Sequence, residues 1–241
     1  MPIRKGDGTT LAPKGYQEIR LGDGTVLYSD GGGLVNRWQF SEGSGSAVAD
    51  SEGSDDGTIT DATWTSGTWI GDNALDFNGS SAKVDTPATT PSRDLALYAT
   101  VSFDTSKSDS EHINTFGNPS GDSDTYRSLE FDGSGNVRMG IRNDATNFDT
   151  VSTSITTGTH RIVGYVDTVN EELGIAVDGT LQNTTATRSS VSASNVGEHG
   201  IGYRRNDNFG YFNGIIDEPM VQNAVPTSQE LTDDFDRQPW S

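Results

Sequence analysis

The sequence predicts an all-β fold, an antiparallel two-sheet jelly-roll sandwich with a small N-terminal arm of β-hairpins. From residue 34 onward, short runs of alternating apolar and polar residues recur, which is typical of half-buried strands. Loops rich in Gly, Ser, Asp, Asn and Thr separate these runs, and such residues favour turns. Helical periodicity occurs only near the end of the sequence. Sandwiches and jelly rolls combine these features.

The first 32 residues predict an arm that differs from the rest of the chain. Residues 3–11 recur as residues 19–27 with seven of nine positions identical, and each copy has Gly-Asp-Gly between two short runs. This pattern is typical of tight hairpins, which are too small to bury a core alone. We therefore expect residues 1–32 to bind a partner surface, through a glycine hinge at 31–33. The alternative is a flexible, tag-like terminus.

The sandwich itself is predicted to span residues 33–241. Its clearest strands are expected at 34–40, 74–77, 95–103, 126–131, 137–142, 160–166, 174–177, 199–203 and 211–221. Alternation predicts twelve side chains that point inward between the sheets: Trp38, Phe40, Leu75, Phe77, Leu97, Phe103, Ile162, Val166, Ile175, Val177, Ile216 and Met220. A short helix is expected at 227–235, where Thr227 or Ser228 can cap the first turn containing Glu230.

Acidic residues dominate the charge of the chain. Asp and Glu number 35 against 16 Lys and Arg, giving a formal net charge of -19. A polyanion would be repelled, so we expect no nucleic-acid partner. Only 4 residues are Lys and 25 of the acidic residues are Asp, a profile that resembles proteins of halophilic archaea or their viruses. In molar salt the Debye length falls to about 3 Å, which screens self-repulsion. The alternative is an acidic protein from an ordinary habitat.

The sequence also excludes disulfides and thiolate metal sites, and it predicts neither a membrane span nor a signal peptide. Cysteine is absent, which excludes disulfides and thiolate metal sites. No apolar run approaches the roughly 20 residues of a membrane span. The first ten residues lack the apolar core of a signal peptide, so we do not expect export by that route.

Four segments carry a resemblance to a known family. They are LVNRWQFSEGSG at 34–45, GDNALDFNGS at 71–80, VDG at 177–179, and NGIIDE at 213–218 followed by AVPT at 224–227. In this order, over about residues 34–236, they resemble the laminin-G-like domains of the concanavalin A-like superfamily. The resemblance implies a concanavalin-A-like sandwich for residues 33–241.

The same resemblance implies a structural or ligand-bridging calcium ion. Many laminin-G-like domains hold calcium through aspartates and carbonyl oxygens, and the matching positions here are Asp50 and Asp217. Hard oxygen ligands suit calcium, and an unpaired Asp217 would be costly to bury on an apolar strand. The alternative is that Asp217 faces an arginine or water.

Catalytic patterns are weak. Glycosidases of this fold carry a Glu-x-Asp-x-x-Glu strand that supplies nucleophile and acid. Residues 130–135 begin with Glu130 and Asp132 but lack the final glutamate, and Asp132-Gly133 is typical of a turn. The three histidines are scattered, with no Ser-His-Asp arrangement. We therefore expect a protein that is not an enzyme.

One loop combines the residue types that favour ligand contact. Residues 202–212 carry aromatic, arginine and amide side chains between two expected strands, and sugar and protein sites favour such mixtures. The predicted ligand-binding residues are Tyr203, Arg204, Arg205, Asn206, Asp207 and Phe209. The alternative is that Tyr203 belongs to the core and the arginines pair with local carboxylates. Asn78 and Asn183 occupy glycosylation sequons, which matter only in an exported chain.

These features lead to one functional prediction and two alternatives. We expect a non-enzymatic surface protein of the virion of a halophilic archaeal virus, such as a tail fibre, turret or capsid spike. It would bind a host-surface glycan or glycoprotein, contact other virion proteins through residues 1–32, and form a homo-oligomer, with a trimer favoured. The alternative is a secreted or cell-surface carbohydrate-binding domain, located outside the cell. A weaker alternative is a glycan-cleaving enzyme.

Overall fold

The structure is a computed structural model of the 241-residue chain. It describes residues 18–20, 26–29, 33–67, 73–89, 94–104, 106–117, 126–142, 148–187, 197–205 and 207–236. The chain divides into two compact units, Met1–Gly33 and Leu34–Ser241.

The described part of the first unit is one antiparallel strand pair. Strand β1 (Glu18–Arg20) pairs with β2 (Val26–Ser29), and Ile19 lies opposite Tyr28. The two strands flank the second Gly-Asp-Gly sequence, so the hairpin predicted for the second copy of the repeat is present. The hairpin predicted for the first copy lies outside the described residues.

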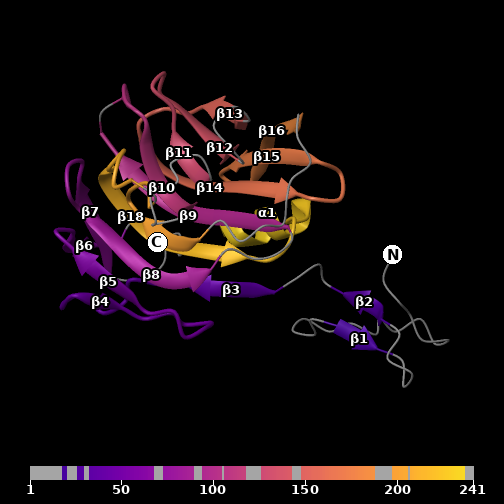
Figure 1. Ribbon diagram of the computed structural model, residues 1–241, viewed down its shortest axis with the longest axis horizontal. Coiled ribbons are helices and arrows are strands. Elements are labelled where there is room, and N and C mark those ends of the chain that lie inside the picture. The colour runs from indigo at the N-terminus through magenta and orange to yellow at the C-terminus, as the bar shows by residue number, and fades with distance from the viewer. Residues whose placement is uncertain are drawn as a thin grey trace. The chain divides into compact units, whose positions relative to one another are not determined.

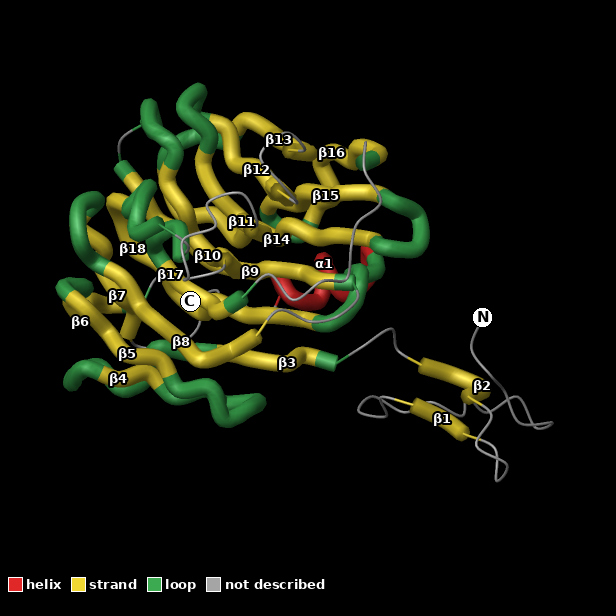
Figure 2. Tube along the Cα trace, in the orientation of Figure 1, coloured by secondary structure: helices red, strands yellow, loops and turns green. Residues whose placement is uncertain are grey.

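The second unit contains two antiparallel sheets (Figures 1 and 2). Sheet I has the strand order β13-β12-β11-β10-β17-β8-β5-β4. Its strands are β4 (Ala47–Val48), β5 (Gly57–Thr60), β8 (Lys83–Thr89), β10 (Glu111–Gly117), β11 (Tyr126–Phe131), β12 (Asn136–Arg142), β13 (Phe148–Ser154) and β17 (Glu198–Ile201). Sheet II has the order β16-β15-β14-β9-β18-β7-β6, and β3 also pairs with β18. Its strands are β3 (Leu34–Arg37), β6 (Thr63–Ser66), β7 (Asn73–Asn78), β9 (Leu95–Phe103), β14 (Gly158–Asp167), β15 (Glu172–Val177), β16 (Thr180–Ala186) and β18 (Asn213–Gln222).

The two-sheet jelly-roll prediction is confirmed, and so is most of the predicted core. Eleven of the twelve predicted inward side chains belong to one buried apolar cluster, with Trp38 and Phe77 fully buried. Met220 is the exception, because it packs in a separate cluster with Tyr98 and Leu231. A bulge between Asp217 and Met220 shifts the register of β18, and one extra residue moves the following side chains to the opposite face.

Helix α1 (Ser228–Asp236) confirms the predicted helix and its cap (Figure 2). The Thr227 hydroxyl accepts a hydrogen bond from the Glu230 amide (3.2 Å), and the Glu230 carboxylate accepts one from the Thr227 amide (2.7 Å). This reciprocal pair is a capping box. Leu231 of α1 then packs on side chains of sheet II. No described helix is long and apolar enough to cross a membrane.

Candidate functional site

The predicted ligand-binding residues lie in the connection between β17 and β18, residues 202–212, which we call the β17–β18 loop. Its two sides are held together because the Arg204 amide donates to the Phe209 carbonyl (2.8 Å) and the Asn208 amide donates to the Arg204 carbonyl (3.1 Å). The loop also lies against sheet I, since the His112 amide donates to the Gly210 carbonyl (2.8 Å). Asn206 lies outside the described residues.

Tyr203 and Arg205 attach this loop to sheet I. Tyr203 is fully buried, and its hydroxyl donates to Asp85. Arg205 donates to the same carboxylate (2.7 Å) and to the Tyr203 hydroxyl (2.8 Å), and it also pairs with Glu198. Burial, with the hydrogen bond to Asp85, raises the pKa of Tyr203. Both side chains therefore have protein partners that hold the loop in place.

Arg204, in contrast, supports an exposed aromatic ring. Its guanidinium forms a two-point ion pair with Asp207, with the Nε–Oδ1 distance at 2.8 Å. The same guanidinium lies 5.0 Å from the ring centroid of Phe209, within the range of a cation–π contact. The Phe209 side chain is 55% exposed. The Asp207–Arg204 pair therefore fixes a ring that faces solvent.

Phe209 borders a hollow of about 560 Å³, which we call the Phe209 hollow. Tyr211 supplies a second ring, stacked on Tyr203 at a centroid distance of 5.9 Å. Burial raises the pKa of Tyr211, so its hydroxyl remains a proton donor. The complete lining is Asn78, Gly79, Ser80, Asp109, Ser110, Glu111, Asn208, Phe209, Gly210, Tyr211 and Asn213. The hollow thus combines apolar ring faces with amide, hydroxyl and carboxylate groups.

A buried lysine that the sequence pattern did not single out lies beside this hollow. Lys107 is 4% exposed, and its ammonium lies 4.6, 5.5 and 5.9 Å from the ring centroids of Phe212, Phe103 and Phe131. It donates to Glu111 (2.9 Å) and to the Asn213 carbonyl. Nothing in the sequence indicates this arrangement, because the three rings come from separate strands and loops.

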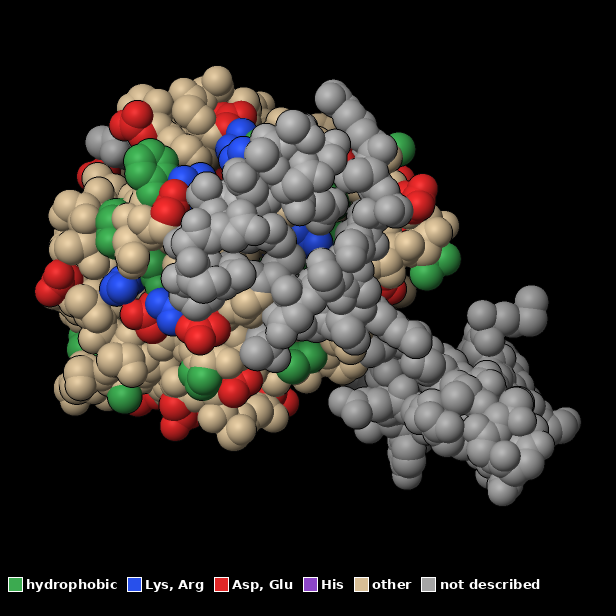
Figure 3. All heavy atoms as spheres, in the orientation of Figure 1, with side chains coloured by type: hydrophobic (Ala, Val, Ile, Leu, Met, Phe, Trp, Pro, Cys, Tyr) green, Lys and Arg blue, Asp and Glu red, His purple; other side chains and the backbone are tan. Residues whose placement is uncertain are grey.

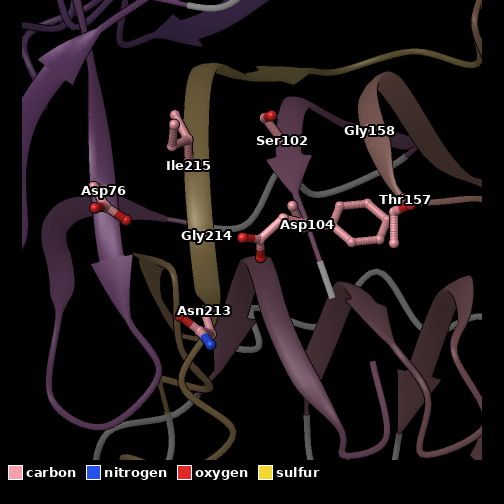
Figure 4. A pocket seen from close by; sticks show the side chains of 9 residues that line it. Asp76, Ser102, Asp104, Thr157, Gly158, Asn213, Gly214 and Ile215 are labelled. Atoms are coloured by element: carbon pink, nitrogen blue, oxygen red, sulfur yellow. The ribbon is translucent and has the colours of Figure 1, made fainter. Parts of the chain in front are cut away.

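Two more hollows lie near the Phe209 hollow. The second, of about 670 Å³, lies where β7, β9 and β18 meet the turn before β14 (Figure 4). Figure 4 shows the side chains of Asp76 and Asp104 on either side of β18 at Gly214. The complete lining is Asp76, Ser102, Phe103, Asp104, Thr157, Gly158, Asn213, Gly214 and Ile215. The third, of about 460 Å³, is lined by Phe103, Ser106, Lys107, Ser134, Gly135, Asn136, Ser154, Ile155, Thr156 and Thr157.

The acidic residues considered for catalysis have structural partners. Glu130 is fully buried, with Oε2 2.6 Å from His112 Nδ1 and Oε1 accepting from Arg138 Nε (2.5 Å). Burial alone would raise the pKa of Glu130, but His112 and Arg138 outweigh it and lower the value to about 2. Asp132 accepts hydrogen bonds from the amides of Ser134 (2.8 Å) and Asn136 (3.0 Å), which confirms the predicted turn.

The surroundings of Asp50, one of the two predicted metal ligands, do not fit calcium. The Asp50 carboxylate accepts from the Asn36 side chain (2.6 Å) and from the amides of Arg37 (2.9 Å), Glu52 and Asp55 (both 3.2 Å). These neighbours present N–H donors, whereas calcium requires oxygen ligands. Asp217 is fully buried in β18. Among the described residues, no group of three or more His, Cys, Asp or Glu side chains could hold a metal ion. Calcium at Asp50 and Asp217 stays a prediction.

Comparison with known proteins gives one family match. The profile of Laminin_G_3, the concanavalin A-like lectin/glucanases superfamily, matches residues 76–232. Curated protein sequences gave no match.

Several solved structures share the fold. One is domain 4 of AbnA, a GH43 extracellular arabinanase from Geobacillus stearothermophilus, in complex with arabinotriose: 18% identity, TM-score 0.66, 85% of this chain and 98% of that one covered. Another is the CBM40 of the Ruminococcus gnavus IT-sialidase bound to α2,3-sialyllactose, with 17% identity and a TM-score of 0.52. That match covers 59% of this chain and 82% of the CBM40 chain. A third is the Trypanosoma rangeli sialidase in complex with the inhibitor DANA, with 16% identity and a TM-score of 0.60. That match covers 92% of this chain and 35% of the sialidase chain. These similarities show the fold alone. Because the family profile covers more than half of the sequence, the chain belongs to the concanavalin A-like lectin/glucanases superfamily.

Proposed function

We propose that this chain is a non-catalytic glycan-binding module whose ligand packs against Phe209. The observation that carries the proposal is the exposed Phe209 ring, fixed by Arg204 at the edge of a hollow that also contains polar groups. An aromatic ring offers a flat apolar surface for the C–H faces of a sugar. The amides and carboxylates of the same hollow can donate to and accept from sugar hydroxyls.

Two further observations support this proposal. Two proteins with this fold were solved with arabinotriose and α2,3-sialyllactose bound. In addition, Glu130, which starts the segment most similar to a glycosidase strand, is fully buried beside His112 and Arg138, where a substrate in solvent does not reach it.

The direct test is the substitution Phe209→Ala. A glycan array identifies a bound oligosaccharide, and calorimetry then compares the variant with the original protein. We expect affinity to fall at least about tenfold, equivalent to about 1.4 kcal/mol. Val169→Ala is the matched control, because Val169 is also an exposed apolar residue, 81% exposed, in the turn between β14 and β15. Equal affinity of the Phe209→Ala variant would refute the proposed site. New reducing ends or unsaturated products from a bound polysaccharide would instead support the enzyme alternative.

The biological setting of this module is a finer proposal that rests on the sequence. The acidic, Asp-rich composition and the repeated hairpin sequence of residues 1–32 favour a surface protein of a halophilic archaeal virion, with the arm attached to other virion proteins and a trimer favoured. The alternative is a secreted or cell-surface carbohydrate-binding domain. Deleting residues 1–32 separates the two: loss of incorporation into particles supports the virion proposal, whereas unchanged secretion and sugar binding support the alternative.

A further inference from the structure

We infer that the three hollows form one continuous binding strip, and that the strip takes a linear, uncharged oligosaccharide and disfavours sialylated or otherwise anionic glycans. This inference rests on the proposed glycan binding and adds its ligand class and extent.

Shared lining residues connect the three hollows. Asn213 lines both the Phe209 hollow and the second hollow, while Phe103 and Thr157 line both the second and the third. Each hollow, at about 560, 670 and 460 Å³, falls within the size range of a small-molecule site. A ligand that follows the shared residues from one hollow to the next must therefore be longer than a single sugar.

Lys107 holds these neighbouring walls together. Its ammonium contacts Glu111 of the Phe209 hollow, the Asn213 carbonyl between the first two hollows, and the Phe103 ring between the last two. Because this ammonium is buried among aromatic rings and paired with Glu111, its position is fixed. One side chain therefore sets the relative placement of the three hollows.

The charges along the strip determine the class of glycan. The carboxylates of Asp109 and Glu111 line the Phe209 hollow, and those of Asp76 and Asp104 line the second hollow. Lys107 is the one basic residue among the described residues that line the strip, and its side chain is only 2% exposed. Acidic side chains are also spread over the described surface visible in Figure 3. The cations nearest the Phe209 hollow, Arg204 and Lys83, are already paired with Asp207 and Asp85. A ligand carboxylate or sulfate would therefore meet like charge without an unpaired cation, which is unfavourable.

Calorimetry with two pairs of probes tests charge and length separately. Lactose and α2,3-sialyllactose differ in one anionic sugar, and arabino-oligosaccharides or cello-oligosaccharides of two and of six units differ in length. We expect sialyllactose to bind at least fivefold more weakly than lactose in moderate salt, with the difference shrinking in molar KCl as the charges are screened. Tighter binding of sialyllactose would overturn the inferred ligand class.

Variants then test the extent of the strip. Asp104→Ala is expected to lower the affinity for the six-unit oligosaccharide about fivefold and to leave the affinity for the two-unit oligosaccharide unchanged. The reason is that Asp104 lines only the second hollow. Asp236→Ala is the matched control, because Asp236 is an exposed acidic residue of α1. It is expected to leave the affinity for both oligosaccharides unchanged. If Phe209→Ala weakens both chains while Asp104→Ala weakens neither, the strip is refuted and the glycan-binding proposal survives. If none of these neutral oligosaccharides binds and the glycan array shows no ligand, the inferred strip and the glycan-binding proposal both fail.

Discussion

His199 shows how a single buried side chain can set the pH dependence of this protein. Its ring stacks on Trp38, with centroids 4.7 Å apart. The Asn114 amide nitrogen donates to the carbonyls of Tyr98 (3.0 Å) and Met220 (3.2 Å), so its oxygen faces His199 Nε2 at 2.5 Å. Nε2 therefore donates, and Nδ1 accepts from the Thr86 hydroxyl (3.1 Å). This arrangement holds the imidazole neutral, and burial together with the charge of Arg205 lowers the pKa of His199 to about 3.

We predict that the neutral state of His199 makes the protein less stable in acid. Between the ordinary histidine pKa of about 6.5 and the folded value of about 3, the unfolded state binds the extra proton. The free energy of unfolding therefore falls as the pH decreases through this window, by up to about 1.4 kcal/mol per pH unit from this group. Denaturant unfolding from pH 7 to pH 4 measures the slope, which His199→Gln should reduce.

His160 provides the matched control with the opposite sign. The Asp178 carboxylate, 2.8 Å from Nδ1, raises the pKa of His160 despite partial burial. Its stabilisation is therefore complete below about pH 6.5 and is lost as the pH rises through the raised folded value. The substitution His160→Gln should lower the free energy of unfolding at pH 5 and should lower it less at pH 8. Equal pH slopes for the two histidine variants would contradict both assignments.

Among the elements, helix α1 is attached to sheet II by a buried ion pair as well as by the packing of Leu231. Arg161 of β14 is 1% exposed and donates from Nε (2.8 Å) and Nη2 (3.2 Å) to the two oxygens of Asp234 in α1. Its Nη1 donates to the Glu218 carbonyl (2.9 Å) at the bulge of β18. A single guanidinium thus joins the helix to β14 and β18, which lie on either side of β9.

We predict that Asp234→Ala will destabilise the protein by about 3 kcal/mol or more. The reason is that the Arg161 charge would remain buried without its main partner, and breaking one side of a buried pair is costly. Chemical denaturation measures the change in the free energy of unfolding. Asp233→Ala, at the adjacent exposed residue of the same helix, should change it by no more than about 0.5 kcal/mol. Similar losses from the two variants would show that the ion pair does not attach the helix.

At the scale of the whole molecule, the net charge of -19 is the dominant electrostatic feature. Repulsion among carboxylates destabilises a compact chain, and this repulsion acts over distances that dissolved ions screen. The ion pairs described above neutralise selected carboxylates, including Asp85, Glu130 and Asp234. With 35 acidic and 16 basic residues, 19 negative charges remain uncompensated by Lys or Arg.

We predict that the melting temperature rises with salt between low ionic strength and molar KCl. Thermal unfolding followed by circular dichroism measures this dependence. An uncharged stabiliser such as sucrose is the control, because it favours compact states without screening charge. A melting temperature that stays the same after dialysis to low salt would contradict the halophilic interpretation of the composition.

Features that depend on local patterns could be predicted from the amino-acid sequence. Strands β9 and β11 begin and end where alternation places them, and the capping box of α1 follows from Thr227 and Glu230 at the correct spacing. The pattern missed β10, because the polar residues His112 and Asn114 are buried there and interrupt its apolar residues. It also failed for β16, whose mainly polar side chains are mostly exposed.

Local patterns did not predict which of the candidate residues face solvent and which have partners. Tyr203, Arg205 and Phe209 are close in sequence, yet the first two bind Asp85 on β8 and only Phe209 is exposed. Lys107 acquires its role from rings on β9, β11 and the β17–β18 loop. The physical reason is that alternation and capping act between near neighbours along the chain. Burial and ion pairing, in contrast, depend on which distant strands the two sheets bring together.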